Sequence, residues 1–158
     1  MIRVLTLADE AATLALGHRL APALDPPQVV YLKGDLGAGK TTLARGILRA
    51  LGHAGPVKSP TYTLVESYDL ERLTVHHLDL YRLGDPSELE ALGIRDLLDP
   101  TALLLVEWPE RGEGWLPPAD VEVQLSHVAK GRSARIRAHS PRGRALMGLL
   151  TPVSQRTS

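Results

Sequence analysis

Cysteine, phenylalanine and asparagine are absent from this chain of 158 residues. Without cysteine there is no disulfide, no thiolate metal site and no thiol nucleophile, which suits a cytoplasmic protein. Only four tyrosines and two tryptophans supply aromatic rings, so the core has to be built from leucine, valine and alanine. Asparagine is also the first residue of the Asn-Lys-x-Asp element with which P-loop GTPases read guanine, and its absence excludes that element.

Long hydrophobic runs are also missing. The longest unbroken apolar run covers residues 102–106, far below the roughly 20 residues of a transmembrane helix. Asp9 and Glu10 interrupt the N-terminal region before a long apolar stretch could form, so we expect no signal peptide. The 18 basic and 18 acidic side chains cancel, which disfavours a strongly basic DNA-binding domain.

The neutrality hides an uneven distribution of charge. Residues 1–118 hold 11 basic and 16 acidic groups, whereas residues 119–158 hold 7 basic and 2 acidic groups. The basic end could contribute to nucleotide binding or face an acidic partner surface. Arginine outnumbers lysine by 14 to 4, and this bias together with the missing asparagine fits a GC-rich genome as well as a thermophile.

The hydrophobic patterns predict a domain with both helices and strands. Apolar residues at helical spacing indicate helices over residues 8–20, 41–51, 86–92 and 144–150. Short β-branched or alternating runs indicate strands over residues 2–5, 29–32, 61–68, 74–81, 102–106, 121–128 and 133–138. Thr6 and Asp9 resemble a capping box before the first helix. We expect a three-layer α/β domain, with a mixed sheet flanked by helices, over residues 1–140, and a C-terminal helix with a frayed tail over 141–158.

The strongest local signal is a phosphate loop between the second strand and the second helix. It reads Gly34-Asp35-Leu36-Gly37-Ala38-Gly39-Lys40-Thr41 and fits G-x-x-x-x-G-K-[ST] in full. Glycines allow backbone N–H groups to turn toward a phosphate, and the start of the helix adds unpaired N–H groups. The lysine then reaches the β- and γ-phosphates, and the threonine hydroxyl ligates Mg²⁺. The pattern predicts a P-loop NTPase-like domain.

A bound nucleotide also needs a carboxylate that orients the metal at the end of a neighbouring strand. Glu107 follows the apolar run 102–106, and Asp79 follows residues 75–78 in the strand before it. Strand alternation places His77, Asp79 and Tyr81 on one face. We favour Glu107 as the Mg²⁺ partner, although both acids could contribute.

The absence of a guanine-reading element favours ATP over GTP. Two other functions fit a phosphate loop at this length: a small-molecule kinase and a nucleotide-binding module without catalysis. A kinase needs an arginine-bearing lid, for which Arg132, Arg135 and Arg137 are candidates, unless they simply face solvent.

Three further motifs follow the loop in chain order: Ser59-Pro60-Thr61-Tyr62-Thr63-Leu64-Val65-Glu66, His77-Leu78-Asp79-Leu80-Tyr81-Arg82-Leu83 and Val106-Glu107-Trp108-Pro109-Glu110. With the loop extended to Thr42, they resemble the TsaE family, formerly YjeE. These bacterial ATPases support synthesis of the threonylcarbamoyl modification on the tRNA adenosine beside the anticodon. The resemblance covers residues 2–138, and none of the four motifs departs from it.

The resemblance implies a set of ligand-binding residues. The phosphates of ATP or ADP would be bound by Gly37, Ala38, Gly39, Lys40, Thr41 and Thr42. It also implies that Thr41 and Glu107 hold Mg²⁺ and that Asp79 lies beside the metal and is needed for hydrolysis, so that Lys40, Asp79 and Glu107 form the catalytic set.

Further positions are implied outside the loop. Glu10 and Arg132 are expected to contact the nucleotide, and Trp108 is a further functional residue. Residues 59–66 would act as a switch segment near the γ-phosphate. Within that segment Thr61 suits either a polar switch contact or a hydroxyl that caps the turn after Pro60.

Members of the family are thought to act on a partner. The resemblance implies docking on the TsaD–TsaB pair, which transfers threonylcarbamoyl to tRNA, and ATP hydrolysis that resets this complex between turnovers. We therefore expect slow hydrolysis by the isolated protein, stimulation by the pair, and only an indirect relation to tRNA.

Overall fold

The structure is a computed structural model that describes residues 2–150, so the frayed tail expected over the last eight residues lies outside the described part. The described elements follow in the order β1 (Ile2–Leu7), α1 (Glu10–Leu20), η1 (Ala21–Ala23), β2 (Gln28–Lys33), α2 (Lys40–Ala50), β3 (Val65–Asp69), β4 (Thr74–Asp79), α3 (Glu88–Ala91), α4 (Ile94–Leu97), β5 (Ala102–Glu107), η2 (Pro109–Gly112), β6 (Val121–Val128), β7 (Gly131–Ala138) and α5 (Pro141–Leu149). None of the helices between residues 2 and 150 is long and apolar enough to span a membrane.

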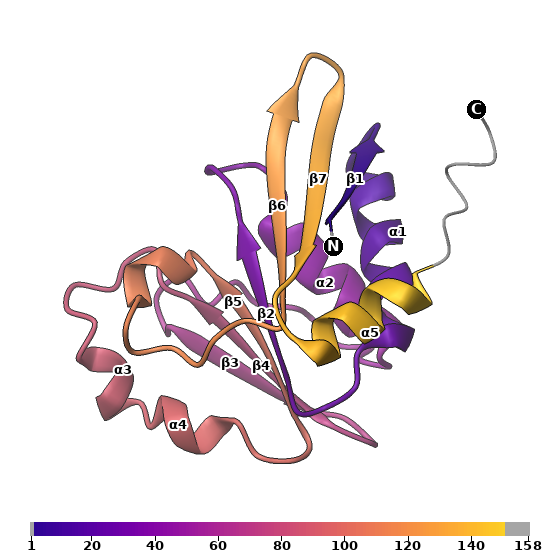
Figure 1. The fold of residues 1–158 in the computed structure, drawn as a ribbon. Helices are drawn as coiled ribbons and strands as arrows, with labels where there is room; N and C mark the ends of the chain where they lie inside the picture. The colour runs from indigo at the N-terminus through magenta and orange to yellow at the C-terminus, as the bar shows by residue number, and fades with distance from the viewer. Residues whose placement is uncertain (1, 151–158) are drawn as a thin grey trace.

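The strands form one mixed sheet in the order β1-β7-β6-β2-β5-β4-β3 (Figure 1). Strand β2 runs parallel to β6 and β5, and β5 runs parallel to β4. The remaining pairs, β1 with β7, β6 with β7 and β3 with β4, are antiparallel. Because β2, β5 and β4 share one direction, their carboxyl ends meet at one edge of the sheet. Ligands of open α/β sheets bind at this edge.

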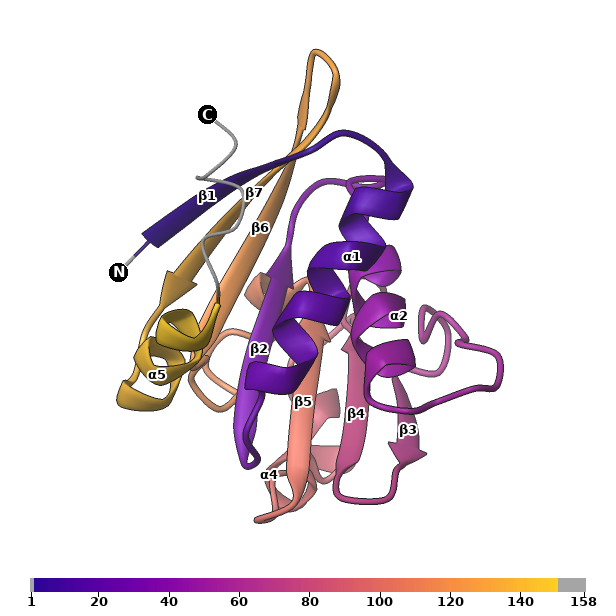
Figure 2. The ribbon, with the colours of Figure 1, turned by 90° about the vertical axis from the view of Figure 1, so that its right-hand side faces the viewer.

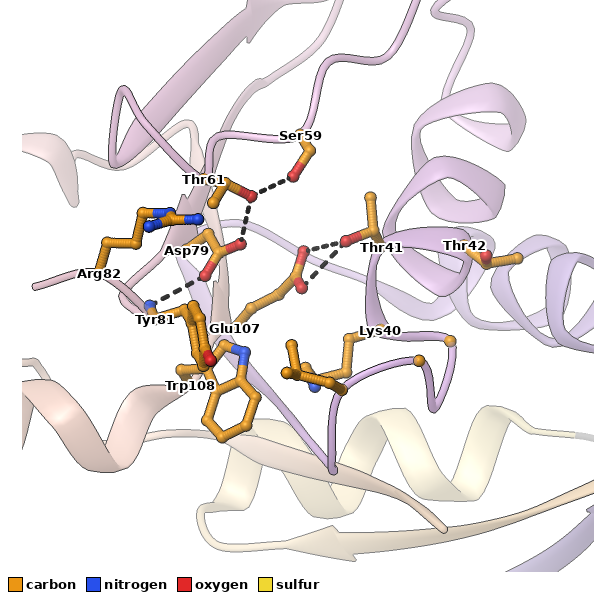
Figure 3. A pocket seen from close by; sticks show the side chains of 13 residues that line it. Lys40, Thr41, Thr42, Ser59, Thr61, Asp79, Tyr81, Arg82, Glu107 and Trp108 are labelled. Carbon is orange, nitrogen blue, oxygen red and sulfur yellow. Dashed lines mark hydrogen bonds between the residues drawn. The ribbon is translucent and has the colours of Figure 1, made fainter. Parts of the chain in front are cut away.

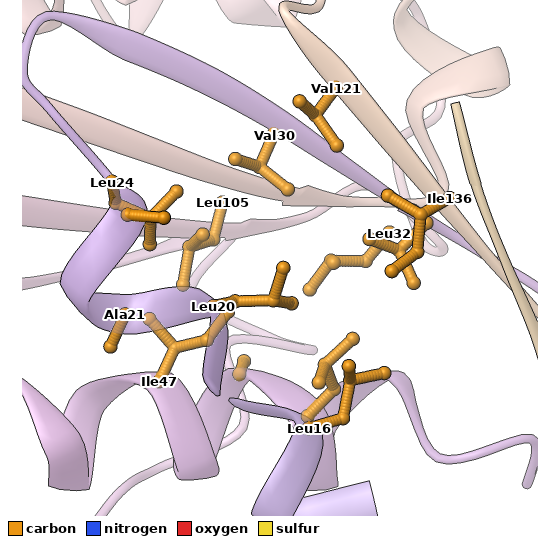
Figure 4. Packing of buried hydrophobic residues seen from close by; sticks show 14 of the residues in the cluster. Leu16, Leu20, Ala21, Leu24, Val30, Leu32, Ile47, Leu105, Val121 and Ile136 are labelled. Carbon is orange, nitrogen blue, oxygen red and sulfur yellow. The ribbon is translucent and has the colours of Figure 1, made fainter. Parts of the chain in front are cut away.

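Helices α1 and α2 lie side by side on one face of the sheet (Figure 2). Val30 and Leu32 of β2 point to this face and join Leu16 of α1 and Ile47 of α2 in one buried cluster (Figure 4). Helix α5 adds Leu146 to the same cluster. This packing anchors α2, which begins at the phosphate loop, to the central strand that leads into the loop.

The other face of the central strands carries a second buried cluster. Val29, Leu104 and Val106 point away from α1 and α2 and pack with Leu89 of α3 and Ile94 of α4. Helices therefore cover both faces of β5, which explains its unbroken apolar sequence. The three-layer α/β architecture with a mixed sheet is confirmed.

Two local expectations are wrong. Helix α1 is capped by Asp9, whose side chain accepts a hydrogen bond from the backbone N–H of Ala12 at 2.9 Å. Thr6 instead lies in β1 opposite Ser133, because the strand continues to Leu7 and leaves no room for a cap at Thr6.

The strand expected over residues 61–68 begins only at Val65. The backbone N–H of Leu64 donates to the Pro60 carbonyl at 2.8 Å, and Leu64 has a left-handed φ of 69°. This turn presents residues 59–64 to the carboxyl edge of the sheet. Helix α4, which follows Gly93, is an addition that the periodicity did not indicate.

Candidate active site

The phosphate loop occupies the carboxyl edge of the sheet between β2 and α2. Gly39 is the N-cap of α2 and has φ 108°. Gly34 has φ 144°, and a Cβ on it would lie 2.5 Å from the carbonyl oxygen of Leu125 in β6. Both positions require glycine. The loop is therefore held close to the sheet, with its backbone curved toward the start of α2, a geometry suited to an anion.

Beside the loop lies a cavity of about 530 Å³. Nine of the residues singled out in the sequence line it: Gly37, Gly39, Lys40, Thr41, Thr42, Thr61, Asp79, Glu107 and Trp108. The structure thus brings together residues that lie up to 71 positions apart in the chain, from Gly37 to Trp108.

Lys40 folds back over the loop from which it projects. Its Nζ donates hydrogen bonds to the carbonyl oxygens of Gly34, at 2.5 Å, and Asp35, at 3.0 Å. The indole of Trp108 covers the ammonium group, 4.3 Å from the ring centroid. Burial lowers the pKa of Lys40, although the carboxylate of Glu107 acts in the opposite direction. The residue is 5% exposed, so a phosphate that replaced the two carbonyls would restore a full charge partner to this ammonium group.

Thr41 and Glu107 form the next contact along the cavity (Figure 3). The Thr41 hydroxyl lies 3.1 Å from Oε1 and 3.0 Å from Oε2 of Glu107. Glu107 is the last residue of β5 and is paired with Asp79, the last residue of β4. The parallel register therefore places both predicted carboxylates side by side at the edge of the sheet, next to the loop threonine.

Asp79 is held by the turn that follows it and by the segment 59–64. Its Oδ1 accepts a hydrogen bond from the backbone N–H of Tyr81 at 3.0 Å, and its Oδ2 accepts one from the Thr61 hydroxyl at 3.2 Å. Thr61 is in turn 2.7 Å from the hydroxyl of Ser59. Burial raises the pKa of Asp79 despite these hydrogen bonds. The Thr61 side chain points to Asp79.

His77 is a contact of the site that was not expected. Its ring is fully buried, and Nε2 lies 2.6 Å from Oε2 of Glu107. Its Nδ1 has no hydrogen-bond partner among the described residues. The alternation of β4 places His77 on the same face as Asp79. Its approach to Glu107, however, depends on the pairing of β4 with β5, which sequence does not give.

Trp108 has a left-handed backbone, with φ 56°, which is rare outside glycine. This conformation turns the indole from the end of β5 over Lys40 and beside Tyr81, with ring centroids 5.0 Å apart. The cavity is also lined by Leu36, Ser59, Tyr81 and Arg82. These four residues fall inside the sequence motifs, so the motifs marked the right segments without indicating each side chain.

A second cavity, of about 180 Å³, lies at the other side of the phosphate loop. Glu10, Ala38 and Arg132 line it, together with Gly39 and Thr42, which also reach the larger cavity. Glu10 and Arg132, expected as nucleotide contacts outside the loop, are thus next to the loop but apart from Glu107.

Each of these two side chains has a further anchor. Nη2 of Arg132 donates to the carbonyl oxygen of Gly37 at 3.1 Å. Glu10 forms an ion pair with Arg45 of α2 at 3.0 Å.

The other arginines of the C-terminal strand do not reach either cavity. Arg135 and Arg137 are exposed on β7, where they face Val4 and Ile2 of β1. They are therefore not placed as the lid that a small-molecule kinase needs. Within residues 2–150 there is also no group of three histidine, aspartate or glutamate side chains arranged for a metal ion.

Comparison with known proteins assigns a family to this arrangement. The model of the family "Threonylcarbamoyl adenosine biosynthesis protein TsaE" matches residues 7–136. The chain belongs to the TsaE family. Proteins of this family take part in tRNA threonylcarbamoyladenosine biosynthesis, which confirms the resemblance seen in the motifs.

Individual TsaE proteins are similar over most of their length. The tRNA threonylcarbamoyladenosine biosynthesis protein TsaE of Haemophilus influenzae is 44% identical over 146 residues, which cover 89% of this chain and 92% of that protein. The protein of the same name from Nostoc is 38% identical over 135 residues, 82% of each chain. The crystal structure of Bacillus subtilis YdiB superimposes with a TM-score of 0.80 at 26% identity and covers 100% of this chain and 99% of that one.

Proposed function

We propose that this TsaE-family chain is a Mg²⁺-dependent ATPase that serves tRNA threonylcarbamoyladenosine biosynthesis. The observation that carries the proposal is the contact of the phosphate-loop Thr41 with Glu107, at 3.0 and 3.1 Å, and the pairing of Glu107 with Asp79. A loop threonine beside an acid at the tip of a neighbouring strand is the arrangement with which P-loop NTPases hold the metal of a nucleotide.

The phosphates would occupy the loop in place of internal contacts. Lys40 would exchange the carbonyls of Gly34 and Asp35 for β- and γ-phosphate oxygens. The negative charge of these oxygens favours the protonated form of Lys40 more strongly than neutral carbonyls do. Backbone N–H groups of residues 37–42 and the positive end of the α2 dipole supply the remaining contacts. Trp108 would cover the lysine and restrict access of water to it.

The nucleoside would extend toward the second cavity. The two cavities are adjacent, because Gly37, Gly39 and Thr42 line both. Arg132 and Glu10 stand on the far side, where ribose hydroxyls and a base offer hydrogen-bond partners. We assign adenine as the base because the chain has no asparagine with which to build the guanine-reading element.

Two residues that line the cavity, Thr41 and Glu107, fit Mg²⁺. This ion binds oxygen in an octahedron at about 2.0–2.1 Å, so neighbouring ligand oxygens stand about 3 Å apart. Thr41 Oγ1 and Glu107 Oε2 are 3.0 Å apart, which suits two adjacent ligands. These two residues would hold the ion, with phosphate oxygens and water in the other positions. When bound, the ion neutralises negative charge on the β- and γ-phosphates.

Asp79 and Thr61 are assigned to the hydrolytic step. Asp79 faces the cavity beside Glu107 and accepts a hydrogen bond from the Thr61 hydroxyl. A carboxylate in this position orients a water molecule toward the γ-phosphate. Because Thr61 lies on residues 59–64, the position of that segment would control how Asp79 meets the water.

The protein would act with partners rather than alone. We propose docking on the TsaD–TsaB pair, with ATP hydrolysis resetting that complex, so that tRNA is served without direct contact. Slow hydrolysis in isolation follows if the pair completes the site, as partner groups do in other P-loop enzymes. A cytoplasmic location accompanies this role.

Release of inorganic phosphate from ATP tests the proposal. The wild-type protein should release phosphate slowly with Mg²⁺, faster when the TsaD–TsaB pair is added, and not measurably with EDTA. Lys40→Ala should abolish release in both conditions, whereas Arg72→Ala, in the exposed β3–β4 connection, should leave it unchanged. Equal release by Lys40→Ala and wild type would contradict the assignment of the site.

The same assay separates the alternatives. A small-molecule kinase would consume ATP only with a metabolite present and would attach the phosphate to it. A binding module would bind ATP without turnover under any of these conditions.

A further inference from the structure

Arg82 is a cation in the larger cavity to which the proposed function assigns no role. Among the residues that line the cavity, only Lys40 and Arg82 carry a positive charge. Lys40 lies on the phosphate loop. Arg82 follows the end of β4 by three residues and projects from the opposite wall (Figure 3). A γ-phosphate bound between these walls would face one cation on each side.

The guanidinium of Arg82 is not paired with an acid. No ion pair of Arg82 with a carboxylate occurs in the part of the chain that the structure describes, although Asp79 is only three residues away. The group stacks instead on the ring of Tyr62, 4.6 Å from the centroid, and Nη2 donates to the Tyr62 hydroxyl at 3.5 Å. Both are weak contacts at an exposed site, because Tyr62 is 82% exposed. The charge is therefore held at the mouth of the cavity without being neutralised.

Tyr62 lies on the segment whose neighbours already reach the reaction site. Ser59 and Thr61 line the cavity, and Thr61 bonds Asp79. A movement of residues 59–64 toward a γ-phosphate would therefore carry along the ring on which Arg82 rests. The long arginine side chain can follow this movement without a change in the backbone of β4.

The transition state of ATP hydrolysis is stabilised by a positively charged group near the γ-phosphate. A water oxygen forms a bond to the γ-phosphorus while the bond from that phosphorus to the β–γ bridging oxygen breaks. The electron pair of the broken bond stays on ADP, one water hydrogen stays on the inorganic phosphate, and the other leaves as a proton to solvent. Negative charge grows on the bridging and γ-phosphoryl oxygens, and a guanidinium hydrogen-bonded to them lowers the barrier.

We propose that Arg82 is a catalytic arginine supplied by the chain itself. Its guanidinium gives up the contact with Tyr62 and donates hydrogen bonds to the γ-phosphoryl oxygens in the transition state. The inference rests on the proposed ATPase function. It assigns to Arg82 the role that a partner's arginine plays in other P-loop NTPases. Arg82 contributes to the rate and not to the binding of ADP, since ADP has no γ-phosphate.

Two measurements on Arg82→Ala test the assignment. Phosphate release should fall to about a thousandth of the wild-type rate, the lower end for an arginine finger, whereas the Kd for Mg²⁺·ADP measured by calorimetry should stay within about twofold. Tetrafluoroaluminate should tighten ADP binding to the wild type and fail to do so in Arg82→Ala, because it mimics the transferred phosphoryl group. Arg82→Lys should recover only part of the rate, because ammonium lacks the planar fork of guanidinium.

Arg72→Ala is the matched control, since this exposed arginine lies in the β3–β4 connection at the other end of the hairpin. It should keep the wild-type rate and the wild-type response to fluoroaluminate. If Arg82→Ala keeps both, or loses ADP affinity in proportion to rate, Arg82 is not a transition-state group, while the ATPase function stands. If the wild-type protein releases no phosphate with or without the pair, the proposed function and this inference are both overturned.

Discussion

Glu107 is a carboxylate that the fold buries almost completely. It is 2% exposed, and a buried charge is tolerated only when hydrogen bonds surround it. Thr41 contacts it from α2 and His77 from β4. The two contacts differ in how firmly the partner is held. Thr41 belongs to the phosphate loop and can turn to a ligand, whereas His77 is fixed inside the sheet. His77 therefore sets the orientation of Glu107 when the loop moves.

Replacement of His77 by alanine should reveal this dependence. We expect His77→Ala to lower the free energy of unfolding by about 2–4 kcal/mol, because it leaves a void and removes one of the two hydrogen-bond partners of a buried carboxylate. In a Glu107→Gln background the same substitution should be less harmful by at least about 1 kcal/mol, since no charge is left unpaired. Urea unfolding of the four proteins measures this coupling. Equal losses in both backgrounds would mean that His77 acts only through its volume.

His76 points to the opposite face of β4 and offers a test of pH dependence. It is 8% exposed and its Nδ1 lies 2.7 Å from the Ser67 hydroxyl. Burial lowers the pKa of His76 from the ordinary value of 6.5. As pH falls through about 6.5, the unfolded chain therefore binds a proton that the folded chain resists, and stability is lost.

We expect His76→Gln to reduce this loss. The free energy of unfolding of the wild type should decrease more between about pH 7.5 and 5.5 than that of His76→Gln. His127→Gln, at an exposed position near the end of β6, should keep the wild-type slope. Chemical unfolding at several pH values gives the slopes. Parallel profiles for wild type and His76→Gln would show that His76 titrates alike in both states.

At the scale of elements, the site depends on how closely α2 packs against α1. A Cβ on Gly46 would lie 2.6 Å from the carbonyl oxygen of Leu14, and one on Gly17 would lie 2.7 Å from the backbone nitrogen of Ile47. The two helices are thus in backbone contact at this crossing. Since α2 begins with Lys40 and Thr41, a shift of the helix would move the loop relative to β5.

A pair of glycine substitutions separates this contact from helix propensity. Gly46→Ala should lower the free energy of unfolding by about 2–4 kcal/mol despite the better intrinsic propensity of alanine. Gly148→Ala, on α5, should raise it by up to about 1 kcal/mol, because nothing lies within 4 Å of the added Cβ. Denaturant unfolding compares the two. Stabilisation by both substitutions would show that the helices can separate without strain.

The elements also show what can be predicted from sequence. The strand, loop and helix around Lys40 follow from local rules: β-branched residues, glycines at left-handed positions and amphipathic spacing. Strand order and register depend on pairing between distant segments, and these decide that Asp79 lies beside Glu107. Thr6 was misassigned as a cap because β1 gains its last residues from pairing with β7, a contact that the local pattern does not contain. The motifs supply residues that line one cavity, but only the sheet explains how these residues come together.

At the scale of the whole molecule, the neutral charge results from a basic C-terminal region that offsets an acidic body. Residues 119–158 carry 7 basic and 2 acidic groups. The fold uses the basic groups in different ways. Arg142 pairs with Asp25 at 3.7 Å, Arg132 reaches the phosphate loop, and Arg135 lies exposed on β7. One strand of this region, β7, thus presents one arginine to the loop and others to solvent.

This division predicts different effects for two arginines three residues apart. Arg132→Ala should weaken Mg²⁺·ADP binding by about 10- to 100-fold, the effect of losing a hydrogen bond from a charged group, because Arg132 lines the cavity beside Gly37. Arg135→Ala removes the same charge from the same strand and should leave the Kd within about twofold, since its side chain faces away from both cavities and the long-range field of one exposed charge is screened. Calorimetric titration of both variants with ADP, at two salt concentrations, distinguishes a local contact from a general effect of charge. Equal weakening that disappears at high salt would mean that the basic region attracts the nucleotide only through its net charge.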